Sequence, residues 1–394
     1  MRDLPSTFRY LWFGTLINRL GGFAVPFLML FLTVRLGFEP AVAAAVVSTL
    51  GLGSFLAQLT GGELADRLGR RPVMLLSFFV TPVVLLGVGL ARELWMLVPA
   101  TFALGFFIDL YRPAVSATII DVVPEDRRTR AFGYLYWAIN LGASIGPVAA
   151  GFLANVDYFL LFVIDAVTTL AYGVVVYMRV PESQSREIAA AARDRNTGAR
   201  LGAAFGDSTF ALFVGLFVLV GLIYSQHLVT LPVDMAAKGL APSDYGLAIG
   251  LNGALIVLLT ISITRMAERW PRFRTIAVHA LLLGVGFGLT GFAMTLPFFM
   301  LTVAIWTFGE ILGAAVAPAL VAELSPPALR GLYQGIWGSS WGLAFFLGPA
   351  LGGFAYQELG SIGFWSIAFG LGLVVAAGYL GLSLVTRRRA TVPG

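Results

Sequence analysis

Apolar runs of about 20 residues recur along the whole chain, and short stretches rich in Arg, Gly and Pro separate them. A run of this length crosses the hydrocarbon core of a bilayer as one α-helix. Because lipid offers no partner to unpaired backbone groups, such runs must be helical. The alternating segments typical of a membrane β-barrel do not occur in the sequence. The pattern predicts twelve spans, near residues 9–34, 41–60, 72–91, 94–121, 131–154, 157–178, 208–232, 244–264, 274–295, 297–323, 331–356 and 361–384.

Composition and cysteine content narrow the class further. Hydrophobic residues make up 58% of the chain and charged residues 12%, whereas a soluble domain carries about 25% charged residues. There is no Cys, and the two His residues, His227 and His279, leave little room for an imidazole metal centre. We therefore expect no metal and no cofactor. The first run is too long to be a cleaved signal peptide, so we expect it to be a retained span.

The basic residues give the predicted spans an orientation. When the N-terminus is placed in the cytoplasm, only Arg35, Arg92 and Lys238 of the 26 Lys and Arg residues fall outside, and Arg19 and Arg112 fall within spans. This is the positive-inside distribution of a multi-pass protein of the cell membrane, with both termini cytoplasmic. The net charge of +5 is thus a signal of topology and does not indicate nucleic-acid binding.

The two halves of the chain repeat each other at a constant offset of 202 residues, as between Ala65 and Ala267. The register runs without gaps and pairs residues 65–151 with 267–353. Matched positions include Asp66 and Glu268, Arg70 and Arg272, Asp121 and Glu323, Gly133 and Gly335, Pro147 and Pro349, and Gly151 and Gly353. A same-sense repeat of six spans predicts two pseudo-symmetric six-helix bundles related by an axis along the membrane normal. The predicted fold is an all-α membrane protein with bundles at 1–178 and 208–394 and a cytoplasmic linker at 179–207.

Two motifs carry a family resemblance. Residues 62–71 read Gly-Glu-Leu-Ala-Asp-Arg-Leu-Gly-Arg-Arg and lie between the second and third spans. They resemble the signature loop of the major facilitator superfamily, G-x-L-A-D-R-x-G-R-R/K. A glycine-proline motif in the fifth and eleventh spans resembles that of the twelve-helix drug:proton antiporter branch, although Ala150 replaces one glycine. The motif residues are Gly142, Gly146, Pro147, Gly151, Gly348 and Pro349.

This resemblance implies a transporter that works by alternating access and exports lipophilic or amphipathic small molecules, such as drugs, in exchange for protons. A proton-coupled symporter of a sugar, amino acid or peptide is the alternative, since residues 18–23 are faintly similar to the first helix of peptide symporters. One arginine of the antiporter branch is missing, because its position in the fourth span holds Thr101. No nucleotide-binding loop or nucleophile arrangement occurs in the sequence, so we do not expect an enzyme.

The signature loop predicts a gate. By the resemblance, Asp66 would sit against the positive N-terminal end of the eleventh span, and Glu268 would sit against that of the fifth. These contacts would latch the cytoplasmic side shut, while the arginines pair with acids or anionic lipid. A charge cluster that only sets topology is the alternative. The predicted gating residues are Gly62, Asp66, Arg67, Gly69, Arg70, Arg71, Arg130, Glu268 and Arg330.

Charged residues inside the spans predict the coupling site, because each costs on the order of 3 kcal/mol to bury in a membrane and is usually functional. Asp109 and Arg112 are three residues apart, so they share a helix face and are expected to pair. The offset maps Glu310 next to Asp109, so each half carries an acid in its fourth helix. An arginine keeps a nearby carboxylate ionised, whereas a dry cavity favours protonation. Glu310 is therefore the predicted proton carrier, with Asp109, Arg112 and Arg19 beside the path; structural pairing is the alternative for Asp109.

Polar and aromatic positions on spans that the resemblance places at the central cavity are the predicted substrate contacts. They are Asn18, Gln58, Tyr111, Tyr136, Asn140, Tyr224, Gln226, His227, Asn252 and Trp306. Aromatic residues also populate lipid-facing belts, which is the alternative for any single one of them. Asp165, in the sixth span, is expected to be a hydrogen-bonded structural acid. The expected partners are a small-molecule substrate, protons and membrane lipid, and the chain is expected to be a monomer.

Overall fold

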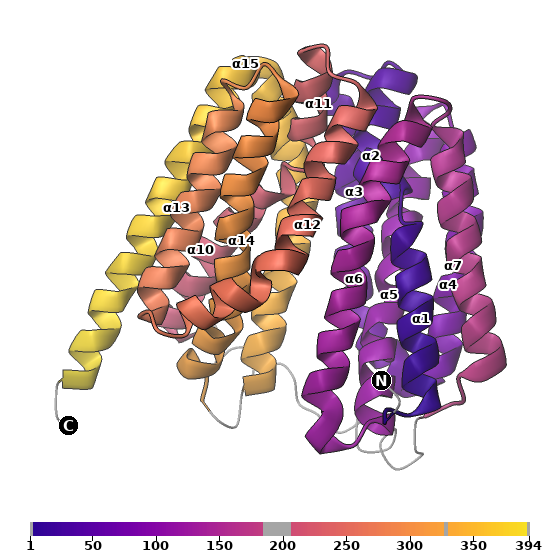
Figure 1. Ribbon diagram of the computed structural model, residues 1–394, viewed down its shortest axis with the longest axis horizontal. Coiled ribbons are helices and arrows are strands. Elements are labelled where there is room, and N and C mark those ends of the chain that lie inside the picture. The colour runs from indigo at the N-terminus through magenta and orange to yellow at the C-terminus, as the bar shows by residue number, and fades with distance from the viewer. Residues whose placement is uncertain (1–2, 184–205, 327–329, 392–394) are drawn as a thin grey trace.

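The computed structural model describes residues 3–183, 206–326 and 330–391 (Figure 1). Most of the predicted linker, 179–207, therefore lies outside the described residues. Two groups of helices stand side by side, one coloured indigo to magenta and the other orange to yellow, with both chain termini at the same end. We call this the terminal end and the opposite one the far end.

The first group contains residues 6–179. Its elements are α1 (Ser6–Leu20), α2 (Ala24–Leu30), the π-helix η1 (Phe31–Arg35), α3 (Pro40–Leu68), α4 (Arg70–Leu90), α5 (Leu94–Val122), α6 (Glu125–Ala154) and α7 (Phe159–Arg179). Turn residues separate neighbouring helices for physical reasons. Pro40 opens α3, where its missing N–H costs nothing. Gly69 adopts φ 102°, a conformation that favours glycine, and so permits the abrupt turn from α3 into α4.

The second group contains residues 208–391. Its elements are α10 (Ser208–Ser225), α11 (Thr230–Ala237), α12 (Pro242–Ala267), α13 (Arg272–Thr290), α14 (Leu296–Leu324) and α15 (Arg330–Thr391). The last of these is two helices in sequence, because Gly360 has a non-helical backbone with φ 65° and ψ −176°.

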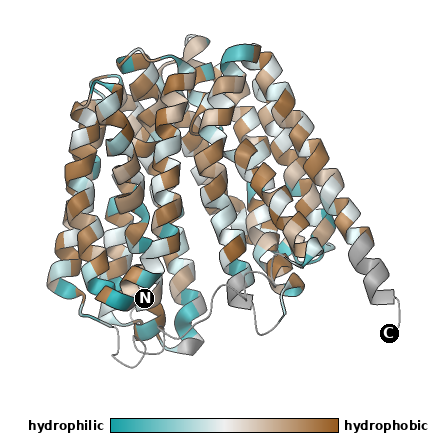
Figure 2. Cartoon of the chain, turned by 180° about the vertical axis from the view of Figure 1, so that it is seen from behind, coloured by the Kyte–Doolittle hydropathy of each residue, from teal (hydrophilic) through white to brown (hydrophobic). Residues whose placement is uncertain are grey.

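The number of membrane crossings agrees with the sequence pattern. Eleven segments of the described chain are long and apolar enough to span a bilayer, and the last, Tyr333–Leu384, is divided by Gly360. This gives twelve crossings and confirms the predicted all-α membrane fold. Hydrophobic residues cover most of the length of the helices, and hydrophilic ones gather toward their ends (Figure 2).

Two crossings predicted as continuous helices are in fact broken. The first is interrupted at residues 21–23 and the seventh at residues 226–229. A break inside a membrane frees backbone groups that must find partners. At the first break the Ala24 N–H donates to the buried Asp165 carboxylate at 3.2 Å. At the second, the Gln226 carbonyl accepts from the N–H groups of Thr230 and Leu231 at 3.0 and 2.9 Å.

The two halves meet through α3 against α15 and α6 against α12. Glycines bring these helices to backbone contact: a side chain on Gly246 would overlap the Pro147 carbonyl, and one on Gly353 would overlap Ala44. Toward the terminal end of the same helices, Gly133 and Gly335 have no neighbour within 4 Å of an added Cβ. The halves are therefore closed against each other at the far end and open at the terminal end.

At the terminal end each half is held together by its own ion pair. Arg70 lies 2.8 Å from Asp121, and Arg272 lies 2.7 Å from Glu323. The two pairs are related by the sequence offset of 202 residues, so the duplicated pattern forms the same contact twice. In the first half the Glu182 carboxylate also accepts the Arg70 and Arg71 N–H groups, each at 3.1 Å, which caps the start of α4.

The far-end contact yields a stability prediction. We expect Gly246→Leu to lower the free energy of unfolding by about 1–3 kcal/mol, because the added side chain meets backbone that has no room to yield. Thermal unfolding of the purified protein in detergent checks this. Gly87→Leu is the control, since a Cβ there meets nothing within 4 Å. Equal unfolding midpoints for the two variants would contradict the far-end packing.

Candidate functional site

A cavity of about 720 Å³ lies between the two halves. Its wall comes from α1, α2, α3, α5, α6 and α7 on one side and from α10, α12, α14 and α15 on the other. The predicted residues in its lining are Arg19, Asp109, Arg112 and Glu310 of the coupling set and Asn18, Gln58, Tyr111, Asn140, Tyr224, His227 and Asn252 of the substrate set. The fold thus brings together residues that are up to 292 positions apart, as Asn18 and Glu310 are.

The N-terminal wall of the cavity carries paired charge. Arg112 Nε lies 2.8 Å from Asp109 Oδ1, as the spacing on α5 predicts, and Asp109 is 7% exposed. Arg19, on α1, donates to the Tyr111 hydroxyl at 3.4 Å. Its Nε is buried and has no hydrogen-bond partner in the described structure. This wall therefore presents one satisfied ion pair and one arginine with a free donor.

The C-terminal wall carries a carboxylate with neutral partners. The Tyr224 hydroxyl donates to Glu310 Oε1 and Asn252 Nδ2 donates to Glu310 Oε2, both at 2.7 Å. Asn252 Nδ2 also lies 3.0 Å from the Thr307 hydroxyl. Hydrogen bonds to a charged acceptor are short and strong. Glu310 thereby links α14 to α12, which packs on the other half, and to α10 just before its break.

Aromatic rings surround Tyr224 on this wall. Its ring centroid lies 4.5 Å from that of His227, 5.5 Å from that of Trp341 and 6.5 Å from that of Phe345. All four residues line the cavity. The glutamate therefore sits beside a broad apolar surface, a combination suited to a molecule with a polar or charged group on a hydrophobic body.

Three predicted substrate contacts lie outside the lining. Trp306 is 1% exposed and stacks on Phe287 at 5.3 Å, because it faces α13 rather than the cavity. Gln226 is 4% exposed and donates to the Gly348 carbonyl at 2.9 Å, because the break after α10 turns it toward α15. Tyr136 is 46% exposed on α6 and is not among the residues that line the cavity.

Asp165 has more contact with the cavity than expected. It is hydrogen-bonded, as predicted, by the Ala24 N–H and, at 3.5 Å, by the Thr169 hydroxyl. It nevertheless belongs to the cavity lining. The nearby Asn18 side chain also binds Thr169, at 2.8 Å. This polar group holds α7 against the break in the first crossing.

The glycine-proline motifs pack both within and between the halves. A Cβ on Gly142 would overlap Arg19 at the first break, and a Cβ on Gly348 would overlap Ser225 beside the second. A Cβ on Gly151 would lie 2.8 Å from the Pro242 carbonyl of α12, in the other half. Gly142 and Gly348 therefore pack against the helices beside the two breaks, and Gly151 contributes to the contact between the halves at the far end.

The gating residues lie at the open terminal end. Arg67 pairs with Glu63, Arg130 pairs with Asp3, and Glu268 is exposed. The side chains of Asp66 and Arg330 lie outside the described part of the chain. The latch would form only when the terminal end closes, so it stays a prediction for that other conformation.

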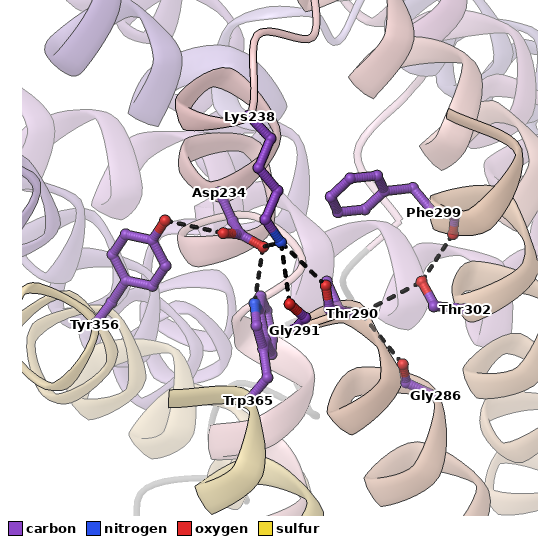
Figure 3. A network of polar contacts seen from close by, with 9 residues as sticks. All are labelled: Asp234, Lys238, Gly286, Thr290, Gly291, Phe299, Thr302, Tyr356 and Trp365. Atoms are coloured by element: carbon purple, nitrogen blue, oxygen red, sulfur yellow. Dashed lines mark hydrogen bonds and ion pairs between the residues drawn. The ribbon is translucent and has the colours of Figure 1, made fainter. Parts of the chain in front are cut away.

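A charged cluster that the sequence interpretation missed lies at the far end (Figure 3). Asp234 is 0% exposed and binds Lys238 Nζ at 2.9 Å, the Tyr356 hydroxyl at 2.9 Å and Trp365 Nε1 at 3.0 Å. Lys238 also donates to the Thr290 carbonyl at 3.3 Å. The cluster ties α11 to both parts of α15 and to the end of α13. The i, i+4 spacing of Asp234 and Lys238 in the sequence could have predicted their ion pair.

Both halves match one family. The family model described as Major Facilitator Superfamily matches residues 11–237 and again residues 217–394. The chain belongs to the major facilitator superfamily. It is therefore a multi-pass membrane protein and a secondary transporter of small molecules, not an enzyme.

Curated relatives cover most of the chain. The "Uncharacterized MFS-type transporter YqjV" of Bacillus subtilis (strain 168) is 27% identical over 88% of this chain and 86% of its own length. The "Na(+), Li(+), K(+)/H(+) antiporter" of Planococcus maritimus is 26% identical over 78% and 79%. The "Multidrug resistance protein MdtH" of Salmonella arizonae (strain ATCC BAA-731 / CDC346-86 / RSK2980) is 24% identical over 84% and 80%.

Among solved structures, the nucleoside transporter NupG superposes with a TM-score of 0.80, covering 96% of this chain and 99% of that one at 14% identity. This likeness shows a shared fold.

The Asp109–Arg112 pair yields a stability prediction. We expect Arg112→Gln to destabilise the transporter by about 1–3 kcal/mol, less than the ~3–5 kcal/mol of a fully buried pair, because Arg112 is half exposed while Asp109 is left buried and unpaired. The double variant Asp109→Asn/Arg112→Gln should recover most of the loss, since no charge then remains. Unfolding midpoints measure both, and a double variant no more stable than Arg112→Gln would contradict the pairing.

Proposed function

We propose that this transporter exports lipophilic or amphipathic small molecules in exchange for protons, by alternating access between the two halves. The observation that carries the proposal is Glu310, a carboxylate in the cavity wall whose hydrogen-bond partners, Tyr224 and Asn252, are neutral. Asp109, at the opposite wall, is paired with Arg112. Glu310 is thus the acid whose charge a proton or a cationic substrate would neutralise.

The contacts of Glu310 offer a route from proton binding to movement. A carboxylate accepts stronger hydrogen bonds than a neutral carboxylic acid, so protonation would weaken the bonds from Tyr224 and Asn252. Tyr224 lies just before the break between α10 and α11, and α11 contacts α2 of the other half. Asn252 is on α12, which packs on α6. Protonation of Glu310 would therefore alter helices that hold the far end closed.

The substrate class follows from the surroundings of Glu310. Tyr224, Trp341 and Phe345 offer ring faces beside the carboxylate, and cations bind favourably over such faces. One relative is described as a multidrug resistance protein, which agrees with an amphipathic substrate. We also propose that the terminal end faces the cytoplasm, because the basic residues concentrate there.

A second candidate is the exchange of monovalent metal cations for protons, favoured by the description of the Planococcus maritimus relative. Metal cations require several oxygen ligands. Here both Glu310 oxygens face hydrogen-bond donors, and aromatic carbon covers much of the adjacent wall. The geometry therefore favours an organic molecule over a bare ion.

Transport by liposomes containing the purified protein tests this function. An imposed pH gradient should drive movement of ethidium against the proton flux in the wild type. Glu310→Gln should abolish this coupled movement, because glutamine keeps the shape of the side chain and cannot titrate. It should keep some ethidium binding through the aromatic rings of the cavity wall, although the charge that attracts the cation is gone. Glu358→Gln, at an exposed position of α15, is the matched control and should transport normally.

Unchanged coupling in Glu310→Gln would refute the assignment of the proton carrier. Uptake in the same direction as the protons would indicate symport, and a gradient that drives only Na⁺ or K⁺ would indicate the second candidate.

A further inference from the structure

A second cavity, of about 600 Å³, lies between α1 and α6 toward the terminal end. Its lining is Trp12, Arg130, Gly133, Tyr134 and Trp137. We call it the α1–α6 groove. None of its aromatic residues belongs to the lining of the central cavity.

The groove has a fixed aromatic wall. Trp12 Nε1 donates to the Tyr134 carbonyl at 2.8 Å, which holds the Trp12 ring in place. The Trp137 ring stacks on it with centroids 6.2 Å apart and an angle of 11° between the planes. Trp137 is 45% exposed. One turn away on α6, a Cβ on Gly133 would meet nothing within 4 Å. Free space therefore adjoins an exposed face of the stack.

An ion pair marks the rim of the groove. Arg130 hydrogen-bonds the Asp3 carboxylate, and this bond lowers the pKa of Asp3, so the carboxylate is ionised at neutral pH. The pair as a unit adds no net charge. The aromatic wall of the groove therefore favours a flat apolar group, and the paired charges at its rim do not favour a charged one.

The groove lies on the approach to the central cavity. Trp12 and Arg19 are seven residues apart on α1, and Gly133 and Asn140 are seven apart on α6, so each pair shares a helix face. Arg19 and Asn140 line the central cavity. Along each helix, two turns, about 10 Å, separate the groove residue from the residue that lines the central cavity. A molecule that enters from the open terminal end along these faces meets the groove first.

We propose that the α1–α6 groove is an entry site where a planar aromatic ring of the transported molecule stacks on Trp137 before it reaches Glu310. The proposal rests on the proposed function, because it assumes an organic substrate. Tryptophans at membrane surfaces commonly form a belt with no ligand. Here, however, the stacked rings of Trp12 and Trp137 are held by a hydrogen bond and lie beside free space at Gly133. The same faces of α1 and α6 continue into the central cavity.

Gly133→Leu tests the proposal, because the leucine fills the free space beside Trp137. Gly335→Leu is the matched control: it occupies the symmetry-related position, adds the same bulk to the terminal end, and also meets nothing within 4 Å. The association rate constant with the purified transporter is measured for two probes of equal charge, planar ethidium and non-planar tetraphenylphosphonium. The assay needs no proton gradient.

We expect Gly133→Leu to slow ethidium association about 2- to 10-fold, the range of one aromatic contact, and to leave the tetraphenylphosphonium rate within about twofold of the wild type. Gly335→Leu should leave both association rates within about twofold of the wild type. If Gly133→Leu fails to fold, Trp137→Leu removes the stacking face instead, and the same selective slowing of ethidium association is expected.

Equal rates of ethidium association for the two glycine variants would overturn the entry site, as would parallel slowing of both probes or no ethidium binding by the wild type. Coupled transport that persists in Glu310→Gln would refute the proton carrier alone. The entry site would still be supported in that case if Gly133→Leu acted selectively on ethidium, because the two tests are independent.

Discussion

Contact between the backbones of the two halves at the far end is the constraint on which the other features depend. Gly246 against the Pro147 carbonyl and Gly353 against the Ala44 methyl group bring α12 to α6 and α15 to α3 with no large side chain between them. Closely approaching small residues supply the packing that holds helices together in lipid, where no hydrophobic force drives association. Such contacts continue to the middle of these helices, where Gly51 meets the Phe345 carbonyl and Gly253 meets Ser144, whereas Gly133 and Gly335 nearer the termini meet nothing within 4 Å. The helices therefore diverge toward the termini.

The broken first and seventh crossings give this architecture its functional chemistry. Asp165 completes the hydrogen bonding at one break, and the buried Asp234 holds the helix beyond the other break to α15 (Figure 3). Glu310 stands beside Tyr224, immediately before that second break. Under the proposed function, a proton gained or lost by Glu310 would act beside a break in a helix rather than on a continuous helix. The two halves share a scaffold, but their buried charge differs, and the proposal assigns the proton to the half that holds Glu310.

Features that depend on the length of an apolar run or on a repeated spacing of residues could be predicted from the sequence. Twelve crossings, the duplication and the Asp109–Arg112 pair are all visible in it, because span length and helix periodicity are local properties. The matching ion pairs Arg70–Asp121 and Arg272–Glu323 were implicit in the offset of 202 residues. The breaks were not predicted, because Gly21-Gly22 and Gln226-His227 lie inside long apolar runs that also fit a continuous helix. Tertiary partners satisfy the backbone groups that the breaks free. Trp306 was misplaced for the same reason: its spacing puts it on a cavity helix, but only packing against Phe287 decides its face.

In the proposed exchange, a proton and a cationic substrate compete for the carboxylate of Glu310, which lines the central cavity. The most direct measurement is the number of protons released into weakly buffered detergent solution when the purified transporter binds a saturating cationic substrate. Competition predicts that proton release reaches a maximum of about one proton per molecule as pH is varied, since either ligand neutralises one carboxylate. Glu310→Gln should release none. Equal release by the wild type and Glu310→Gln, or no release by the wild type at any pH where it binds substrate, would contradict it.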